Sequence, residues 1–262
     1  MDEQLELDVA RAMETEPEVL PLLGELLLDL WELGSSADAV VSALRSTWLP
    51  AGARVLDLGC GKGAVAVALA RELGLRVDGI DAFPAFVEAA RSLAHTRGVE
   101  DLCSFRQGDI RRVLEHEGDY DAVLLLSLPI LQDPYRTVGR LRRLVRASGF
   151  MVIDDAFLAP GVESLEGYEG YLGHDATTAA FQAYGDRIVT EIVGSAVETR
   201  SINRRNTDLI RARGERLKTS RPEVAPLVDR YLSSQERETE ILRDDVLCAM
   251  WVLERRLSTS ED

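Results

Sequence analysis

A glycine-rich turn that follows a short apolar run is the strongest chemical signal in the sequence. Residues 55–63 read VLDLGCGKG and lead into an alanine-rich helical segment. Glycines let the backbone turn tightly and approach a ligand closely, and the first turn of the next helix offers free N–H groups to an anion. A carboxylate just before the turn suits a ligand amine. The candidate binding residues of this turn are Asp57, Gly59, Cys60, Gly61 and Gly63.

Two later aspartates follow the next two apolar runs. Asp81 lies 18 residues after Gly63, where an acid accepts hydrogen bonds from ribose hydroxyls in many nucleotide-binding proteins. Asp109 and Ile110 place an acid beside an apolar side chain, which suits the amino group and flat face of an adenine. Because open α/β sheets bind ligands at the carboxyl ends of their strands, these aspartates predict a nucleoside ligand.

The elements that must position these residues are apolar strands that alternate with amphipathic helices. Strands are predicted at 54–58, 76–80, 104–107, 122–126 and 150–153, and helices at 64–73, 84–97, 110–115 and 134–147. Two further strands are predicted at 187–193 and 245–253. Nearly continuous apolar strands separated by helices indicate a parallel sheet that is covered on both faces. The predicted fold class is α/β, with a doubly wound, mostly parallel sheet.

Helical segments flank this predicted core. The leucines between residues 20 and 31 recur at helical spacing and are interpreted as core packing, and Ser36 is a candidate N-cap for a helix at 37–47. A loop or lid rich in glycine and tyrosine is expected at 154–175, before helices near 177–184, 203–219 and 222–240. The chain divides into a helical cap (1–50), a ligand-binding core (51–155), a lid and helical region that includes the sixth strand (156–243), and a terminal strand and tail (244–262).

At these motifs the chain resembles the class I S-adenosylmethionine-dependent methyltransferases, a Rossmann-like superfamily. The matching segments are VLDLGCGKG (55–63), GIDA (79–82), GDI (108–110), YDAVLLLSLP (120–129) and RLVRASGFMVIDD (143–155). The resemblance implies a seven-stranded sheet in which 245–253 is an antiparallel strand inserted beside the sixth. It implies S-adenosyl-L-methionine as the cofactor and a small-molecule methyl acceptor, with residues 1–50 and 156–243 forming the acceptor pocket.

The resemblance also assigns one part of the cofactor to each motif of the core at 51–155. The glycine turn and Asp57 would hold the methionyl part. Asp81 and Ala82 would hold the ribose, and Asp109 with Ile110 would hold the adenine.

Ser127, after the fourth predicted strand, would lie close to the methyl group under the same resemblance. Enzymes that methylate nitrogen in nucleic acids carry an Asn-Pro-Pro-aromatic motif at this point, and Ser127-Leu128-Pro129-Ile130 stands there instead. Methylation of DNA bases is therefore disfavoured.

The glycine spacing also fits dinucleotide-binding oxidoreductases, since Gly59, Gly61 and Ala64 satisfy their pattern. A carboxylate at position 57 would repel a pyrophosphate by roughly 4 kcal/mol at ~4 Å in a surface-like environment, which favours S-adenosylmethionine. Two alternatives to a methyltransferase stay open. They are a non-catalytic regulatory protein that binds S-adenosylmethionine or S-adenosylhomocysteine, and an NAD-dependent oxidoreductase.

A catalytic base is optional, because methyl transfer displaces an already activated sulfonium. A hydroxyl acceptor would need one. His174 is the candidate because it falls in the predicted lid, whereas His95 falls within a predicted helix and His116 in a polar turn. Within the glycine turn, Cys60 is interpreted as a small filler and Lys62 as solvated. Three tyrosines are expected either to line an acceptor pocket or merely to pack the lid, namely Tyr168, Tyr171 and Tyr184. Asp154 and Asp155, after the fifth predicted strand, are expected to face the same edge of the sheet.

Composition narrows the class of protein. The 262 residues include 45 acidic and 30 basic side chains, a net charge of −15 that argues against binding nucleic acid or an anionic membrane. No apolar run reaches the ~20 residues of a membrane helix. Three cysteines without CxxC spacing offer neither a disulfide framework nor a metal cluster, and the acidic N-terminus is unlike a signal peptide. A cytoplasmic protein is expected.

One basic run stands out in this acidic chain. Eight arginines and lysines lie between residues 200 and 221. They would either capture an anionic acceptor or form a solvated helix face that pairs with Asp208 and Glu215, and the second interpretation is favoured.

Overall fold

The computed structural model describes residues 3–128 and 133–257. The chain forms two compact units. The helical unit comprises Met1–Trp31 and Gly194–Cys248, and the sheet unit comprises Glu32–Val193 and Ala249–Asp262. The segment 32–50, which the sequence analysis assigned to a helical cap, thus belongs to the sheet unit, because its helix packs beside the first helix of the core. The functional division into cap, core and lid stays a prediction.

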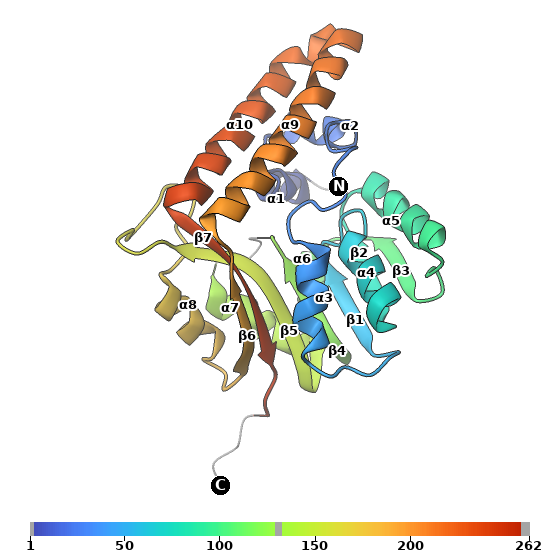
Figure 1. The fold of residues 1–262 in the computed structure, drawn as a ribbon, viewed down its shortest axis with the longest axis vertical. Coiled ribbons are helices and arrows are strands. Elements are labelled where there is room, and N and C mark those ends of the chain that lie inside the picture. The colour runs from blue at the N-terminus through green and yellow to red at the C-terminus, as the bar shows by residue number, and fades with distance from the viewer. Residues whose placement is uncertain (1–2, 129–132, 258–262) are drawn as a thin grey trace. The chain divides into compact units, whose positions relative to one another are not determined.

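A seven-stranded sheet is the centre of the fold (Figure 1). Its order is β3-β2-β1-β4-β5-β7-β6. The pairs β1–β2, β2–β3, β1–β4 and β4–β5 are parallel, whereas β6 and β7 are antiparallel. The predicted doubly wound sheet with an inserted antiparallel strand is confirmed. The strands are β1 (Arg54–Leu58), β2 (Arg76–Asp81), β3 (Cys103–Gln107), β4 (Tyr120–Leu126), β5 (Val145–Leu158), β6 (Arg187–Val193) and β7 (Val246–Glu254).

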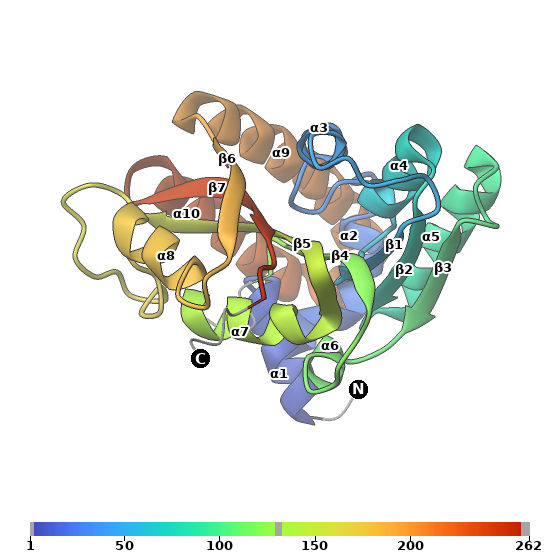
Figure 2. The same ribbon diagram turned by 90° about the horizontal axis from the view of Figure 1, so that it is seen from below.

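Helices cover both faces of the sheet (Figure 2). On one face α3 (Ala37–Arg45), α4 (Ala64–Leu73) and α5 (Pro84–Arg97) pack in series, and α7 (Pro134–Leu144) and α8 (His174–Phe181) pack on the other. The short helix α6 (Ile110–Val113) follows β3. The side chains of Val55, Leu56 and Leu58 in β1 are buried, as expected for a central strand covered on both faces.

Strand register brings the predicted site residues to one edge of the sheet. Leu58 at the end of β1 pairs with Ile80 and Leu125, and Leu126 pairs with Asp154 of β5. The glycine turn and the segments that follow β2, β3 and β4 therefore all leave the sheet at its carboxyl edge. This is the edge at which ligands of open α/β sheets bind.

The helical unit contains α1 (Glu3–Ala12), η1 (Pro17–Leu22), α2 (Leu23–Leu26), α9 (Ala196–Ser220), η2 (Pro222–Val224) and α10 (Ala225–Asp244). Helices α9 and α10 lie side by side (Figure 1). The leucine stripe is core packing, as predicted, since Leu22, Leu23, Leu26, Leu27 and Leu30 are all buried. None of the helices in the described ranges is long and apolar enough to cross a bilayer.

The basic run lies in α9 as far as Lys218, and part of it is paired with acids, as the favoured interpretation predicted. Arg211 lies 2.7 Å from Asp208, and Lys218 lies 2.7 Å from Glu215. Arg213 also donates two hydrogen bonds to Asp29 within the same unit.

The structure corrects three local predictions. The leucine-rich segment is broken into a 3₁₀ helix and one short α-helical turn, because Pro21 lacks the N–H that a continuous helix needs. Strand β5 continues to Leu158, whereas the sequence analysis predicted that a lid begins at residue 154. Helix α8 begins at His174, so that the irregular segment is 159–173 rather than 154–175.

The start of α4 gives a test of the packing. Gly63 has φ of 79°, and a Cβ there would lie 2.8 Å from Ala90 Cβ. Gly98 has a similar φ of 69° but open space around it. Gly63→Ala would strain the left-handed backbone and also crowd Ala90, so it should lower the free energy of unfolding by about 2–4 kcal/mol. Gly98→Ala would strain the backbone alone and should lower the free energy of unfolding by only about 1–2 kcal/mol. Urea unfolding followed by circular dichroism measures both, and equal losses would contradict the close packing at Gly63.

Candidate cofactor site

Asp57 is buried, and one of its two carboxylate oxygens has no hydrogen-bond partner among the described residues. It lies near the end of β1 with 2% of its surface exposed, and its Oδ2 atom has no hydrogen-bond donor. Burial, and then the charge of Asp81, raise the pKa of Asp57 to about 7. Since an unpaired buried carboxylate is unfavourable, this oxygen is suited to a ligand ammonium group.

Asp81 connects the end of β2 to the glycine turn. The Gly61 N–H donates to its Oδ2 at 2.8 Å, and the Phe83 N–H donates to its Oδ1 at 2.9 Å. Burial raises the pKa of Asp81, and these backbone hydrogen bonds oppose the increase. Each carboxylate oxygen has a second lone pair, so that the group retains the capacity to accept hydrogen bonds from ribose hydroxyls.

The glycine turn itself needs glycine. Gly59, Gly61 and Gly63 all have positive φ, at 75°, 51° and 79°. The N–H groups of Gly59 and Cys60 donate to the Ile80 carbonyl, which holds the turn against β2. The turn leads directly into α4, and backbone N–H groups in the first turn of a helix can bind an anion.

Two side chains of the turn are buried. The Cys60 thiol is buried, and this burial raises its pKa, so that it is a poor nucleophile and fits the role of a small filler. Lys62 corrects the sequence interpretation, because only 4% of its surface is exposed. Its ammonium lies 5.7 Å from the ring centre of Phe86 in α5, an arrangement in which the aromatic face attracts the cation.

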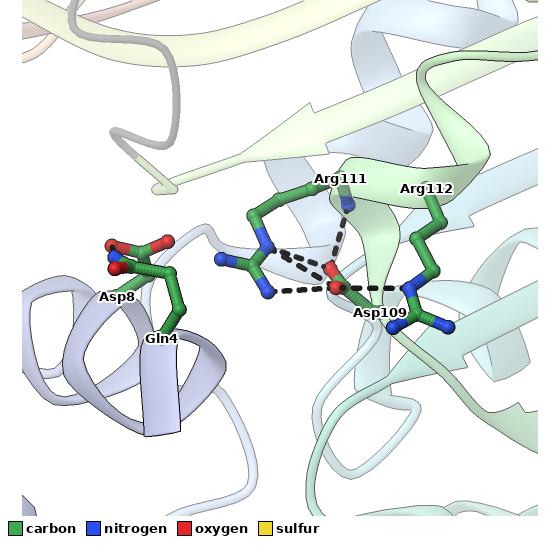
Figure 3. Close-up of polar contacts among 5 residues, drawn as sticks. All are labelled: Gln4, Asp8, Asp109, Arg111 and Arg112. Atoms are coloured by element: carbon green, nitrogen blue, oxygen red, sulfur yellow. Dashed lines mark hydrogen bonds and ion pairs between the residues drawn. The ribbon is translucent and has the colours of Figure 1, made fainter. Parts of the chain in front are cut away.

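Asp109 is held by arginines at the start of α6 (Figure 3). It accepts hydrogen bonds from the Arg111 N–H at 2.9 Å and from the Arg111 guanidinium at 2.8–3.2 Å, and the Arg112 guanidinium lies 3.8 Å away. The hydrogen bond from the Arg111 side chain lowers the pKa of Asp109. The half-buried Ile110 is its neighbour. An adenine amino group would share this carboxylate with Arg111.

Ser127 belongs to a polar cluster that the sequence analysis did not foresee. Its φ is 53°, and its N–H donates to the Asp154 carbonyl at 2.7 Å. Its hydroxyl lies 3.1 Å from that of the buried Ser35, whose side chain also hydrogen-bonds to the Asp154 carboxylate. A Cβ at Gly34 would lie 2.6 Å from the Ser127 side chain. Positive φ at a non-glycine residue is typical of functional sites.

Asp154 and Asp155 of β5 have different hydrogen-bond partners. Burial raises the pKa of both to about 6. Asp154 accepts from Ser35, whereas Asp155 accepts from the Tyr171 hydroxyl at 2.9 Å. The ring of Tyr168 lies 4.9 Å from that of Tyr171. These residues share the carboxyl edge of the sheet with the glycine turn.

His174 and Tyr184 contact residues outside the glycine turn. His174 at the start of α8 contacts Asp175 at 3.1 Å and Glu191 of β6 at 2.7 Å, and these hydrogen bonds raise its pKa. Its ring also lies 5.0 Å from that of Phe157 in β5, two residues after Asp155. Tyr184 stacks on Tyr135 of α7 at 4.8 Å. Pro129 and Ile130, which replace the nucleic-acid methylation motif, fall outside the described residues.

Comparisons with known proteins bear on this arrangement. A family model described as a methyltransferase domain matches residues 55–149. The 27-O-demethylrifamycin SV methyltransferase of Amycolatopsis mediterranei is 31% identical over 119 residues, which cover 45% of this chain and 44% of that protein. The norajmaline N-methyltransferase of Rauvolfia serpentina is 31% identical over 117 residues, which cover 43% and 40% of the two chains. The chain thus spans less than half the length of these curated relatives.

Similarity in fold to solved structures extends over more of the chain than the sequence similarity does. The solved structure of a methyltransferase from Thiobacillus denitrificans in complex with S-adenosyl-L-homocysteine superposes with a TM-score of 0.74 and 23% identity, covering 90% of this chain and 99% of that chain. The resemblance predicted from the motifs is confirmed over residues 55–149, which match the methyltransferase-domain model.

The raised pKa of Asp57 predicts a pH-dependent stability without cofactor. A carboxyl whose pKa rises from 3.8 to about 7 on folding contributes stability that is fully present below 3.8 and lost as the pH rises through 7. Asp57→Asn cannot ionise, so this variant should be more stable than the unsubstituted protein at pH 8, by on the order of 2–4 kcal/mol, with the difference vanishing towards pH 4. Urea titrations across this range measure it. Asp101→Asn at an exposed turn is the control, and a similar pH-dependent gain there would contradict the assignment to Asp57.

Proposed function

We propose that this chain transfers the methyl group of S-adenosyl-L-methionine to a small-molecule acceptor. The observation that carries the proposal is the buried, unpartnered Asp57 Oδ2 beside a glycine turn whose Gly61 N–H is held by Asp81. An ammonium group would satisfy this oxygen, and hydroxyl groups would satisfy the remaining lone pairs of Asp81. The methyltransferase-domain match over these residues supports the same ligand.

The chain's own residues have the following proposed roles. Asp57 binds the methionyl ammonium, and the amides of the glycine turn and α4 bind its carboxylate. Asp81 and Ala82 bind the ribose, while Asp109 and Ile110 face the adenine. The bound cofactor supplies an activated methyl group, so that the protein mainly aligns the acceptor and excludes water.

The acceptor is proposed to be a small metabolite, with oxygen, nitrogen and carbon acceptors all open. The relatives named as a 27-O-demethylrifamycin SV methyltransferase and a norajmaline N-methyltransferase support oxygen and nitrogen acceptors. The net charge of −15 disfavours a nucleic acid or an anionic membrane as a partner. A cytoplasmic location remains part of the proposal.

Asp81→Ala should weaken S-adenosyl-L-methionine binding by about 1.5–3 kcal/mol, since it removes hydrogen bonds to a charged acceptor. Isothermal titration calorimetry measures the affinity of the whole chain for this ligand, for S-adenosyl-L-homocysteine and for NAD(H). Asp78→Ala on the exposed side of the same strand is the matched control and should bind normally. Unchanged affinity of Asp81→Ala would remove the ribose assignment, and binding of NAD(H) alone would favour an oxidoreductase.

An assay of turnover distinguishes an enzyme from a regulatory protein that only binds the cofactor. Formation of S-adenosyl-L-homocysteine with a panel of phenol, amine and activated-carbon acceptors is expected from an enzyme. Tight cofactor binding with no product from any acceptor would favour the non-catalytic alternative.

His174 can be tested in the same assay. Its raised pKa favours the protonated form, and it holds Glu191 of β6, so that we propose a structural role for it. His174→Ala should therefore change the rate by less than about threefold, whereas loss of a general base costs about a hundredfold or more. A loss of that size at unchanged cofactor affinity would restore His174 as the base.

A further inference from the structure

A cavity lies at the amino edge of the sheet, the edge opposite the glycine turn. Its volume is about 280 Å³. It is formed where Gly118 precedes β4, where α7 ends before β5, and where Arg255 follows β7. All of its lining residues belong to the sheet unit, and none is part of the proposed cofactor site.

Three arginines line this cavity, namely Arg142, Arg143 and Arg255. Two acids lie near them. Glu117 is 4.0 Å from Arg143 and strongly exposed, and Asp186 is 2.8 Å from Arg142 and buried. The arginines thus exceed the acids by one positive charge, in a protein whose total charge is −15.

The three arginines differ in the contacts that their guanidinium groups make within the fold. Arg142 is fixed, because its guanidinium donates to Asp186, to the Tyr184 carbonyl and to the Arg256 carbonyl. Arg143 is half-exposed, and its guanidinium lies 4.0 Å from the Glu117 carboxylate.

Arg255 is held by the fold but is not satisfied. One of its terminal nitrogens donates to the Val145 carbonyl. Its Nε–H is buried and has no acceptor. A buried guanidinium N–H without an acceptor is costly, and in native proteins such a group indicates a missing partner.

The wall of the cavity is aromatic on one side. Tyr184 lies over α7, with the Arg142 guanidinium 5.4 Å from its ring centre. A Cβ at Gly139 would lie 2.6 Å from the Tyr184 hydroxyl, so that the absence of a side chain there makes room for this ring.

We propose that this cavity binds the oxyanion group of a small metabolite, a phosphate or a carboxylate. An oxyanion between Arg143 and Arg255 would balance the excess positive charge, and a small turn of the Arg255 side chain towards it would give the buried Nε–H its acceptor. Guanidinium groups bind both kinds of oxyanion with paired, charge-assisted hydrogen bonds. The acidic surface elsewhere repels anions, so that a local cluster of cations is needed to hold one.

A competing arrangement involves Asp186. Its Oδ2 atom is also buried without a partner, and burial raises its pKa, although the Arg256 amide and the charges of Arg142 and Arg255 oppose the increase. If Arg255 turned to pair with Asp186, both orphaned groups would be satisfied within the chain, and the cavity would have no unpaired donor for a ligand.

Three probes that share one ring distinguish these cases. Phenyl phosphate, benzoate and benzyl alcohol are titrated into the cofactor-free full chain, while the arginine Nε–H signals are followed by ¹⁵N NMR. Phenyl phosphate or benzoate should shift the Arg255 signal with a Kd of about 1 mM or tighter, and benzyl alcohol should not. The stronger of the two anions identifies the class of oxyanion.

Variants assign the binding to this cavity. Arg143→Gln should weaken binding of the better anion about tenfold, since it removes one charged donor from a half-exposed position without a role in the core. Arg136→Gln, an exposed arginine of the same helix, is the control and should bind as before. Absence of an Arg255 shift with both anions, or equal weakening by the two variants, would overturn the proposal. Because no cofactor is present, neither result depends on the proposed methyl transfer.

Discussion

The burial of two carboxylates at the ends of neighbouring strands is the constraint on which the carboxyl edge of the sheet depends. Burial and the charge of Asp81 raise the pKa of Asp57, whereas Asp81 accepts hydrogen bonds from the Gly61 and Phe83 amides. The Gly61 amide can reach Asp81 only because the chain turns with positive φ at three glycines. The position of α4, and of the helices packed in series with it, follows from where this turn ends. The protein thus places an unfavourable charge where a ligand cation would relieve it.

Much of the architecture could be predicted because its signals are local. The bounds of α4 and α5 agree with the sequence analysis, since glycines 63, 74 and 98 and Pro84 mark where helices begin and end. Strands β1 and β6 also agree in both bounds. The order of aspartates along the chain placed the candidate residues at one sheet edge, because parallel strands present their carboxyl ends together.

What could not be predicted depends on residues that are distant in sequence. Ser35 and Ser127 are 92 positions apart, and no local pattern shows that their hydroxyls meet. Lys62 was interpreted as solvated because lysine is usually exposed, yet the ring of Phe86 in the next helix covers it. The sequence analysis ended the fifth strand at Ile153 because two aspartates follow it, and aspartate is uncommon inside strands. Strand β5 nevertheless continues through both aspartates to Leu158. Tertiary contacts override propensity in each case.

The insertion of β7 between β5 and β6 has a consequence for how the molecule is made. Strand β6 is complete at Val193, but its hydrogen-bonding partner spans Val246–Glu254. During synthesis β5 and β6 are therefore both finished while the strand that joins them has not yet emerged, and each has an unpaired edge until then. Exposed strand edges are sites of mispairing. While the helices α9 and α10 are being added, the edges of β5 and β6 must not pair with each other. The position between them is filled last, by β7.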